Sequence, residues 1–526
     1  MRRGLVAIGF ALAALAPAGC GEEESAGTGA ELADLAAPDA AIYAEALVRP
    51  EGEQREEIEA ALGTLLGTDD PGGFIVSELE QESEQEGTPT DYSEDVLPWL
   101  GERASAFASS FGGEGEATYA SVVETTDPEA AAVASLAMVE ESGEPFEEKS
   151  YEGIDYLLEE SEDFPASGIV DGHLVGGSEA GFEAVVDAAA GEGLADSTDL
   201  PDDFDALGSD AVLAFYADPA AVLDALEVSG ELAADQRERV EAQFGIGIDE
   251  PVAGSLGATS SSFFFEASSS PGEMTAEAAP ELLAELPADS WFAAAASDFG
   301  EVLDATIEGI DAQFETHGPP SPELIGGIEA AFRRETGLDL REDVLEWMGD
   351  VGFYFRGTSI FGLGGAVIVE TSDEQATLDA LERLRETLER EPSIELEPLD
   401  IEGGGFEIVI VGAPVQVPVV VREGRLVVGL GTDSVEEAFA AGEPLGESEA
   451  LEAATEELGD DLEPTFFFDF EPLVELVEST GQAAGDPGYA EAKPYLDALD
   501  FLVVGQTSED ERVRFRATLG VDEASE

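Results

Sequence analysis

The sequence predicts an α+β protein made of two tandem homologous copies, each a mostly antiparallel sheet covered by helices. The chain has 526 residues, more than the roughly 250–300 residues that one hydrophobic core usually spans. The phrase "TDYSEDVLPWLGE" at 90–102 returns as "LDLREDVLEWMGD" at 338–350. Five further stretches recur in the same order. Such a long period indicates duplication of a whole domain and not a solenoid of short repeats.

The recurring stretches also set the predicted domain limits. They place a first α+β copy at 32–270 and a second at 279–521. Between them, the stretch "SSSPGEMTAEAAPE" is rich in Ser, Pro and Gly, so we expect a linker at 271–278. The last residues, 522–526, are then a short C-terminal tail.

Each copy opens with a predicted strand, "APDAAIYAEA" at 37–46 and "LPADSWFAAA" at 286–295. The repeated phrase comes next and predicts a capped helix joined to a strand. In it, an Asp at the N-cap is followed three residues later by a Glu that can bond back to the Asp amide. Gly101 and Gly349 stand where that helix should end. Trp99 and Trp347 are predicted to anchor a core rather than a site.

A strand followed by a helix comes next in each copy. The stretches "VVETTD" at 122–127 and "IVETSD" at 368–373 end in hydroxyl and carboxyl residues that can accept the first free amides of a helix. In the second copy, leucines at three- and four-residue steps predict that helix over 374–390.

Tight hairpins predict antiparallel pairing. Asp171-Gly172 and Glu423-Gly424 fit a two-residue turn that needs positive φ. Pro418 predicts that its strand lies at a sheet edge or that the proline is near the strand's start. The stretches "ADPAAVLDAL" and "FEPLVELV" then open amphipathic helices, with proline at the first helical position.

Charge excludes several classes of partner. The chain holds 21 Lys and Arg against 119 Asp and Glu, a formal charge of −98. Such a chain repels phosphate backbones and anionic lipid surfaces, so we expect no nucleic acid and no basic membrane patch. Two interpretations stay open: an acidic surface suited to solubility or a salty habitat, and an acidic face that collects cations or a basic partner.

The N-terminal sequence predicts that the protein is exported. Two arginines, a short apolar run and small residues before Cys20 have the layout of a secretory signal over 1–19, too short to span a bilayer. Cys20 is the only cysteine. Its surroundings resemble the lipobox of bacterial lipoproteins, although Pro17 stands where Leu is usual. An unmodified Cys20 behind an ordinary signal is the alternative.

Lipidation of Cys20 would fix where the protein works. The resemblance implies a diacylglyceryl group on Cys20, and a membrane bound through that lipid. The residues that follow, 20–31, are small, polar and acidic and are predicted to form a flexible tether. We therefore expect a secreted protein anchored to the outer face of the bacterial cytoplasmic membrane.

Sequence motifs for catalytic, metal or cofactor sites are weak throughout the chain. His173 and His317 are both interpreted as surface residues, so no Cys/His metal cluster, triad or cofactor site is predicted. The glycine runs at 176–181 and 361–366 lack the Gly-Lys-Ser/Thr ending of a phosphate loop. The aspartates of 199–210 favour a helix start, with weak Ca²⁺ binding as the alternative.

The lipobox-like start, the "PDAAIYAEALVRP" strand and the two "EDVL-W-G" blocks resemble the bacterial family of domain of unknown function 3352. The resemblance covers nearly the whole mature chain and implies a secreted or membrane-anchored protein, with no catalytic residues assigned.

We expect a non-enzymatic, lipid-anchored binding or envelope protein. The phenylalanines of "SSFFFEA" and "TFFFDF" either belong to core strands or line a site, and an apolar ligand is the sharpest form of the hypothesis. The alternatives are a structural or assembly partner in the cell envelope and a carboxylate-dependent hydrolase, which would need two acids in a cleft.

Overall fold

The structure is a computed structural model that consists of two compact units. The described residues up to Ser269 form the first unit, and those from Glu277 onward form the second. The structure describes residues 30–86, 91–112, 117–142, 145–160, 165–207, 211–230, 232–233, 237, 251–269, 277–307, 326–360, 362–399, 404–412, 416–440, 442–481, 483–509 and 512–522.

The first unit contains a sheet in which every neighbouring pair of strands is antiparallel. Its described strands run across the sheet in the order β4 (Phe146–Tyr151), β5 (Ile154–Glu159), β6 (Ala166–Val170), β7 (His173–Gly177), β3 (Thr118–Thr125), β2 (Leu100–Ser110), β1 (Ile42–Leu47), β8 (Ala211–Ala217), β9 (Val252–Ala258) and β10 (Ser262–Ser269).

The sheet of the second unit is also antiparallel. Its order is β14 (Ile394–Glu397), β15 (Gly404–Ile410), β16 (Gln416–Arg422), β17 (Arg425–Gly429), β13 (Gly364–Thr371), β12 (Met348–Arg356), β11 (Ser290–Ala296), β18 (Glu463–Asp469), β19 (Leu499–Glu509) and β20 (Arg512–Val521). Strand for strand, this is the order of the first unit. The predicted α+β class with antiparallel sheets is confirmed.

Helices cover both sheets. Those of the first unit are η1 (Ala33–Leu35), α2 (Gly52–Leu66), α3 (Pro71–Glu86), η2 (Tyr92–Val96), α4 (Pro128–Ser142), α5 (Glu179–Ala190), α6 (Leu194–Ser197), α7 (Leu200–Ala206) and α8 (Pro219–Ser229). Those of the second are α10 (Pro280–Glu285), α12 (Gly326–Thr336), α13 (Leu340–Asp343), η3 (Leu345–Trp347), α14 (Glu374–Leu388), α15 (Thr432–Phe439), η4 (Leu445–Glu447), α16 (Glu449–Leu458), α17 (Phe470–Ser479), η5 (Ala483–Gly485) and α18 (Pro487–Leu496).

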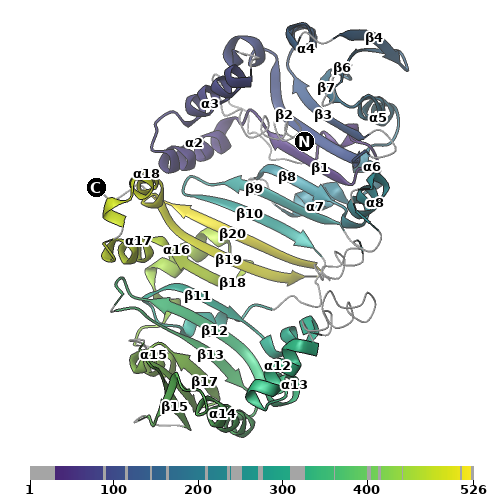
Figure 1. Cartoon of the computed structure of the whole chain (residues 1–526). Helices are drawn as coiled ribbons and strands as arrows, with labels where there is room; N and C mark the ends of the chain where they lie inside the picture. The colour runs from purple at the N-terminus through teal and green to yellow at the C-terminus, as the bar shows by residue number, and fades with distance from the viewer. Residues whose placement is uncertain are drawn as a thin grey trace. The chain divides into compact units, whose positions relative to one another are not determined.

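The second unit has a packed cluster on each face of its sheet. On one face, α10, α15 and α16 cover a core that includes Tyr354 and Phe467; Figure 1 shows α16 behind β18 and β19. On the other face, α14 packs against β14, β15 and β16 over a cluster that includes Trp347 and Phe406. Among the described contacts, α14 packs on the β14 to β16 side of this face, and the β11, β12 and β18 side carries a network of aromatic residues.

The repeated phrase folds as a capped turn in both units, with one correction. Asp91 accepts a hydrogen bond from the Glu94 amide at 3.1 Å, and Asp339 accepts one from the Glu342 amide at 3.3 Å. The bond back to the Asp amide comes from the residue after that glutamate, Asp95 at 3.1 Å and Asp343 at 2.8 Å. The prediction that the glutamate three residues after the capping aspartate bonds back to its amide was wrong. The aspartate four residues after the cap makes this bond instead, because its shorter side chain closes the turn at that spacing.

The tryptophans of this phrase are buried, as predicted. Trp99 Nε1 donates to the Asp95 carbonyl at 2.7 Å, and Trp347 Nε1 donates to the Asp343 carbonyl at the same distance. Gly101 lies second in β2, where a Cβ would approach Glu124 within 2.8 Å. Glycine at this position therefore allows close packing. It does not form the helix C-cap that the sequence pattern predicted.

The hairpins and strand–helix joints agree with the sequence. Asp171 and Glu423 have φ of 47° and 56°, and the glycines that follow them are also at positive φ. Asp127 and Asp373 cap α4 and α14. Pro418 is near the start of β16 but that strand lies inside the sheet, between β15 and β17. In α17, proline occupies the third helical position rather than the first.

Candidate functional site

Several residues singled out in the sequence lie outside the described part of the chain, Cys20 and His317 among them. His173 begins β7, with Nδ1 3.1 Å from the Asp171 carbonyl oxygen. Asp199 is the N-cap residue of α7, and Asp202 and Asp203 fall in its first turn, as expected of a helix start, while Asp210 lies outside the described residues. Among the described residues, no group of three or more acidic, His or Cys side chains could hold a metal ion.

The second unit contains an apolar hollow of about 420 Å³. Its lining residues come from β11, β12, β18 and β19 and from the segments that flank β11: Glu277, Ala294, Ala295, Ala296, Phe299, Val351, Phe353, Thr465 and Gln506. Ligand sites in proteins are mostly apolar concavities of roughly 300–1,000 Å³ with a few polar groups. By size and lining, the apolar hollow qualifies as a candidate site.

Small residues in β11 create the apolar hollow. Ala294 pairs with Phe353 on β12 and with Phe466 on β18, so three neighbouring strands place their side chains on one face. Because alternate residues of a strand point to opposite faces, Ala296 lies on this face as well. Two alanines between larger neighbours leave the space that the ring of Phe353 borders.

An aromatic network continues from the apolar hollow across the same face. Phe292 meets Phe353 edge to face at 5.2 Å between centroids, and it meets Phe466 at 5.2 Å in the same way. Further contacts join Phe355, Phe468, Phe470 and Trp291 to this network. Edge-to-face pairs hold such rings in defined orientations, so Phe353, the member of the network that lines the apolar hollow, is held in place.

The phenylalanines of "TFFFDF" divide between the two faces of the sheet, and the described lining of the apolar hollow includes none of them. Phe467 is buried in the core against the other face, while Phe466 and Phe468 join the aromatic network. Strand alternation divides the run in this way. The sequence contained the aromatic residues, but the hollow depends on the alanines of a neighbouring strand, and nothing in a run of alanines indicates a cavity.

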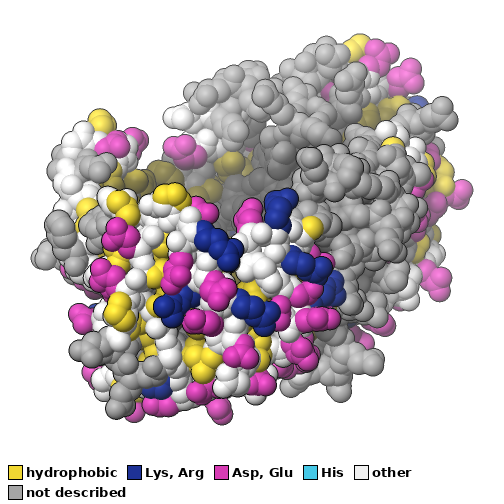
Figure 2. Space-filling model, turned by 60° about the horizontal axis from the view of Figure 1, so that its bottom comes forward, with side chains coloured by type: hydrophobic (Ala, Val, Ile, Leu, Met, Phe, Trp, Pro, Cys, Tyr) yellow, Lys and Arg dark blue, Asp and Glu magenta, His cyan; other side chains and the backbone are white. Residues whose placement is uncertain are grey.

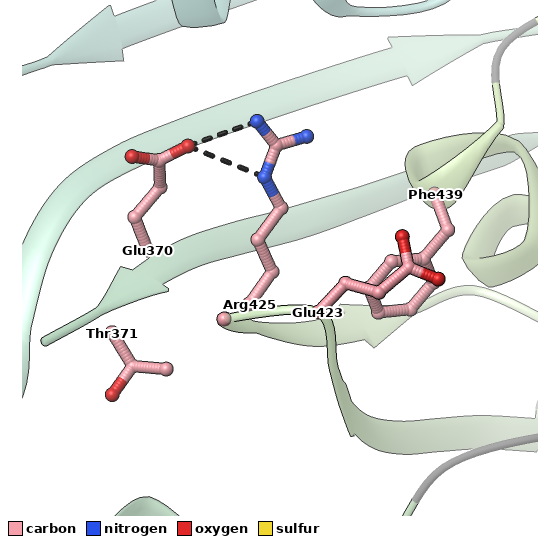
Figure 3. A pocket seen from close by; sticks show the side chains of 6 residues that line it. Glu370, Thr371, Glu423, Arg425 and Phe439 are labelled. Carbon is pink, nitrogen blue, oxygen red and sulfur yellow. Dashed lines mark hydrogen bonds and ion pairs between the residues drawn. The ribbon is translucent and has the colours of Figure 1, made fainter. Parts of the chain in front are cut away.

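A second cavity, of about 380 Å³, is polar (Figure 3). Its lining residues are Glu370, Thr371, Glu423, Gly424, Arg425 and Phe439. Arg425 donates to Glu370 Oε1 through Nε at 3.2 Å and through Nη2 at 2.9 Å, and Nη2 also donates to Glu285 at 2.6 Å. With two carboxylates already on this guanidinium, the cavity has little charge to offer an anionic ligand.

Several arginines of the second unit are held in ion pairs with acidic side chains. Arg341 pairs with Glu329 at 2.9 Å and with Asp304 at 2.8 Å, and Arg383 pairs with Asp343 at 2.9 Å. Figure 2 shows basic side chains set among acidic ones on one face of the molecule. These arginines therefore have carboxylates as their nearest charged neighbours.

The fold and the apolar hollow together define an α+β protein with two antiparallel-sheet units and a concave apolar site in the second. The chain belongs to the family described as "Protein of unknown function (DUF3352)", whose model matches residues 76–520. The family resemblance seen in the sequence is thereby confirmed.

Other comparisons add little. Comparison with curated proteins gives no match. The solved structure described as "Structure of crystal form I of TP0453" matches with 9% identity and a TM-score of 0.25, over 46% of this chain and 79% of that chain. Within the part of the chain that the structure describes, no helix is long and apolar enough to cross a membrane.

Proposed function

We propose that this protein is a lipid-anchored, extracytoplasmic, non-enzymatic binding protein whose second unit holds an apolar ligand. The observation that carries the proposal is the apolar hollow, bordered by Val351, Phe299 and Phe353 and floored by alanines. An apolar molecule placed there would remove these side chains from water, at about 25 cal/mol for each Å² of apolar surface buried.

A space-filling substitution tests ligand binding. Ala294→Leu adds three carbons that point into the apolar hollow, and we expect it to abolish binding while leaving the fold intact, because the new side chain enters open space. The measurement is native mass spectrometry of the protein purified from its own envelope, with and without the substitution. The wild type should carry an apolar adduct that the variant lacks.

The first unit supplies a matched control. Ala44 on β1 pairs with β2 and β8 as Ala294 pairs with β12 and β18. Ala44→Leu should retain the adduct. A wild-type protein that never carries an apolar molecule, under conditions that preserve known lipid complexes, would overturn the binding proposal.

The proposed anchor is a lipid on Cys20. It is supported by the signal-like residues 1–19 and by the acidic tether at 20–31. The protein should partition into the detergent phase, with an N-terminal peptide mass that includes diacylglycerol. Cys20→Ala should release it into the aqueous phase. Equal partitioning of both proteins would contradict the anchor.

We also propose that the two units are tandem copies of one domain. The identical strand order and the matching tryptophan contacts support this origin. A relative that contains a single unit and aligns equally well with both halves would be the decisive find. Relatives with unrelated strand orders in the two halves would contradict it.

One observation favours the alternative of an assembly partner in the envelope. Helix α4 exposes Val133, Leu136 and Met138, with 69%, 38% and 47% of their surfaces accessible. Helix α14, which follows the equivalent strand, exposes charged residues such as Glu382 and Arg383 instead. Cross-linking from position 133 in whole cells tests this alternative, and a failure to capture any envelope protein would exclude it.

A further inference from the structure

We infer that the apolar hollow takes a ligand with a positively charged head, an apolar amine or quaternary ammonium, and that Glu277 determines this specificity. The inference rests on the proposed function, since it specifies the class of ligand for the same hollow.

Among the described residues that line the apolar hollow, one side chain is charged. It is that of Glu277, and the other polar members of this set, Thr465 and Gln506, are neutral. From these residues, a carboxylate or phosphate head would therefore meet a like charge. A cationic head would meet an opposite charge.

Backbone hydrogen bonds fix Glu277 at the rim. The Ser297 amide donates to the Glu277 carbonyl at 3.0 Å, and Ser297 Oγ donates to the Ala278 carbonyl at 2.6 Å. Ala278 forms a bridge with Ala296, at the end of β11. These contacts hold the backbone of Glu277 beside the hollow that this residue lines, and its side chain is exposed.

The Glu277 carboxylate has no ion-pair or hydrogen-bond partner among the residues that the structure describes. Glu370 in the polar cavity differs from Glu277, because Arg425 donates a hydrogen bond to Glu370 Oε1. An acid without an internal partner keeps its charge available for a ligand, whereas a paired acid must first lose its partner.

Aromatic rings complete a site for a cation. Phe299 and Phe353 line the same hollow as Glu277. A cation over an aromatic face gains about 0.5–1 kcal/mol at exposed sites, and more when water is excluded, and quaternary ammonium groups are the usual ligands of such sites. The chain's net charge of −98 also attracts cations to the surface and repels anions.

Three decyl probes separate charge from apolarity: decyltrimethylammonium, decanol and decanoate, each below its micellar concentration. Isothermal titration calorimetry of the full chain should rank the cation first and decanoate last. Glu277→Gln should weaken binding of the cation by up to about fivefold and leave decanol binding unchanged, as expected for the loss of one exposed charge contact.

Glu281→Gln is the matched control. Glu281 is exposed in the neighbouring α10 and does not line the hollow, so this variant changes the net charge by the same amount. It should bind all three probes as the wild type does.

The outcomes separate the two proposals. If none of the three probes binds, the proposed function fails. If decanol binds and Ala294→Leu blocks it, but the cation shows no advantage, the binding function stands and the inferred ligand class is overturned. If Glu281→Gln weakens the cation as much as Glu277→Gln does, the chain's overall field is responsible and the role of Glu277 is overturned.

Discussion

Glu45 is a fully buried carboxyl in β1, at the centre of the first unit's sheet. Its Oε2 accepts hydrogen bonds from the Leu32 amide at 3.0 Å and from the Tyr43 hydroxyl at 2.6 Å. Arg103 Nε lies 3.7 Å from its Oε1 and 3.3 Å from Glu31. Burial raises the pKa of Glu45 to about 7 despite the opposing hydrogen bonds from Tyr43 and Leu32, and the charge of Glu31 contributes to the rise.

This raised pKa makes the stability of the first unit depend on pH. An acid whose pKa is higher in the folded state than in the unfolded state stabilises the fold at low pH and loses that contribution as pH rises. For Glu45 the loss runs from its ordinary value of 4.5 to about 7 and amounts to at most about 3 kcal/mol.

We predict that Glu45→Gln removes this loss, because glutamine keeps an acceptor for Leu32 and Tyr43 but cannot ionise. Urea denaturation at pH 5, 6, 7 and 8 measures the effect as the difference between the wild-type and variant curves. That difference should shift in favour of the variant as pH rises. Parallel curves would show that Glu45 does not titrate in this range.

The equivalent position in the second unit has no acid. Ala295 occupies it, two residues after Ala293, which lies opposite Tyr354 as Tyr43 lies opposite Phe107. Aligning the opening stretches at 37–46 and 286–295 end to end pairs Tyr43 with Phe292 instead. That alignment is off by one residue because β11 has a register shift between Ser290 and Phe292. Such a register shift depends on how β11 pairs with β12, so it cannot be predicted from the local sequence of β11.

Among the elements, the helix starts were the most predictable. Asp373 accepts hydrogen bonds from the amides of Gln375 and Ala376, both at 3.0 Å. Asp373→Ala should lower the free energy of unfolding by about 1 kcal/mol, while Asp373→Asn should retain most of it. The measurement is chemical denaturation of the full chain.

The same helix offers a control for that cap. Glu386 is exposed in α14, far from the first turn. Glu386→Ala should stay within about 0.5 kcal/mol of the wild type. If the two alanine variants cost the same, the cap contributes no more than an ordinary surface residue.

Features determined by interactions within a few residues could be predicted from the sequence. Features that depend on packing between distant segments could not. Two-residue turns and N-caps are determined within a few residues, so Asp171-Gly172 and Asp127 could be found from the sequence alone. The π-helical turn at Tyr92–Val96 and the apolar hollow could not. Each depends on side chains that meet only after distant strands have paired, as Ala294 meets Phe353.

At the scale of the whole molecule, charge dominates. Acidic groups outnumber basic ones 119 to 21, so ion pairs leave most acids without a cation and the folded chain repels itself. Raising NaCl from 10 mM to 1 M shortens the screening length from about 30 Å to about 3 Å. The melting temperature should therefore rise with salt, as measured by calorimetry.

Matched salts distinguish the two interpretations of the acidic surface. If screening alone acts, CaCl₂ and NaCl at equal ionic strength should raise the melting temperature alike. If the surface collects cations specifically, CaCl₂ should raise it more at low concentration. A melting temperature that falls with added NaCl would contradict self-repulsion as the dominant effect.

The placement of the three tryptophans gives the molecule its own spectroscopic reporters. Trp99 is in the first unit, Trp347 is in the second, and Trp291 stacks on Phe355 in the aromatic network beside the apolar hollow. All three are buried, so each indole should emit at short wavelength when folded and shift to the red on unfolding. Variants that retain one tryptophan would follow each unit separately, and Trp291 alone would report what enters the hollow.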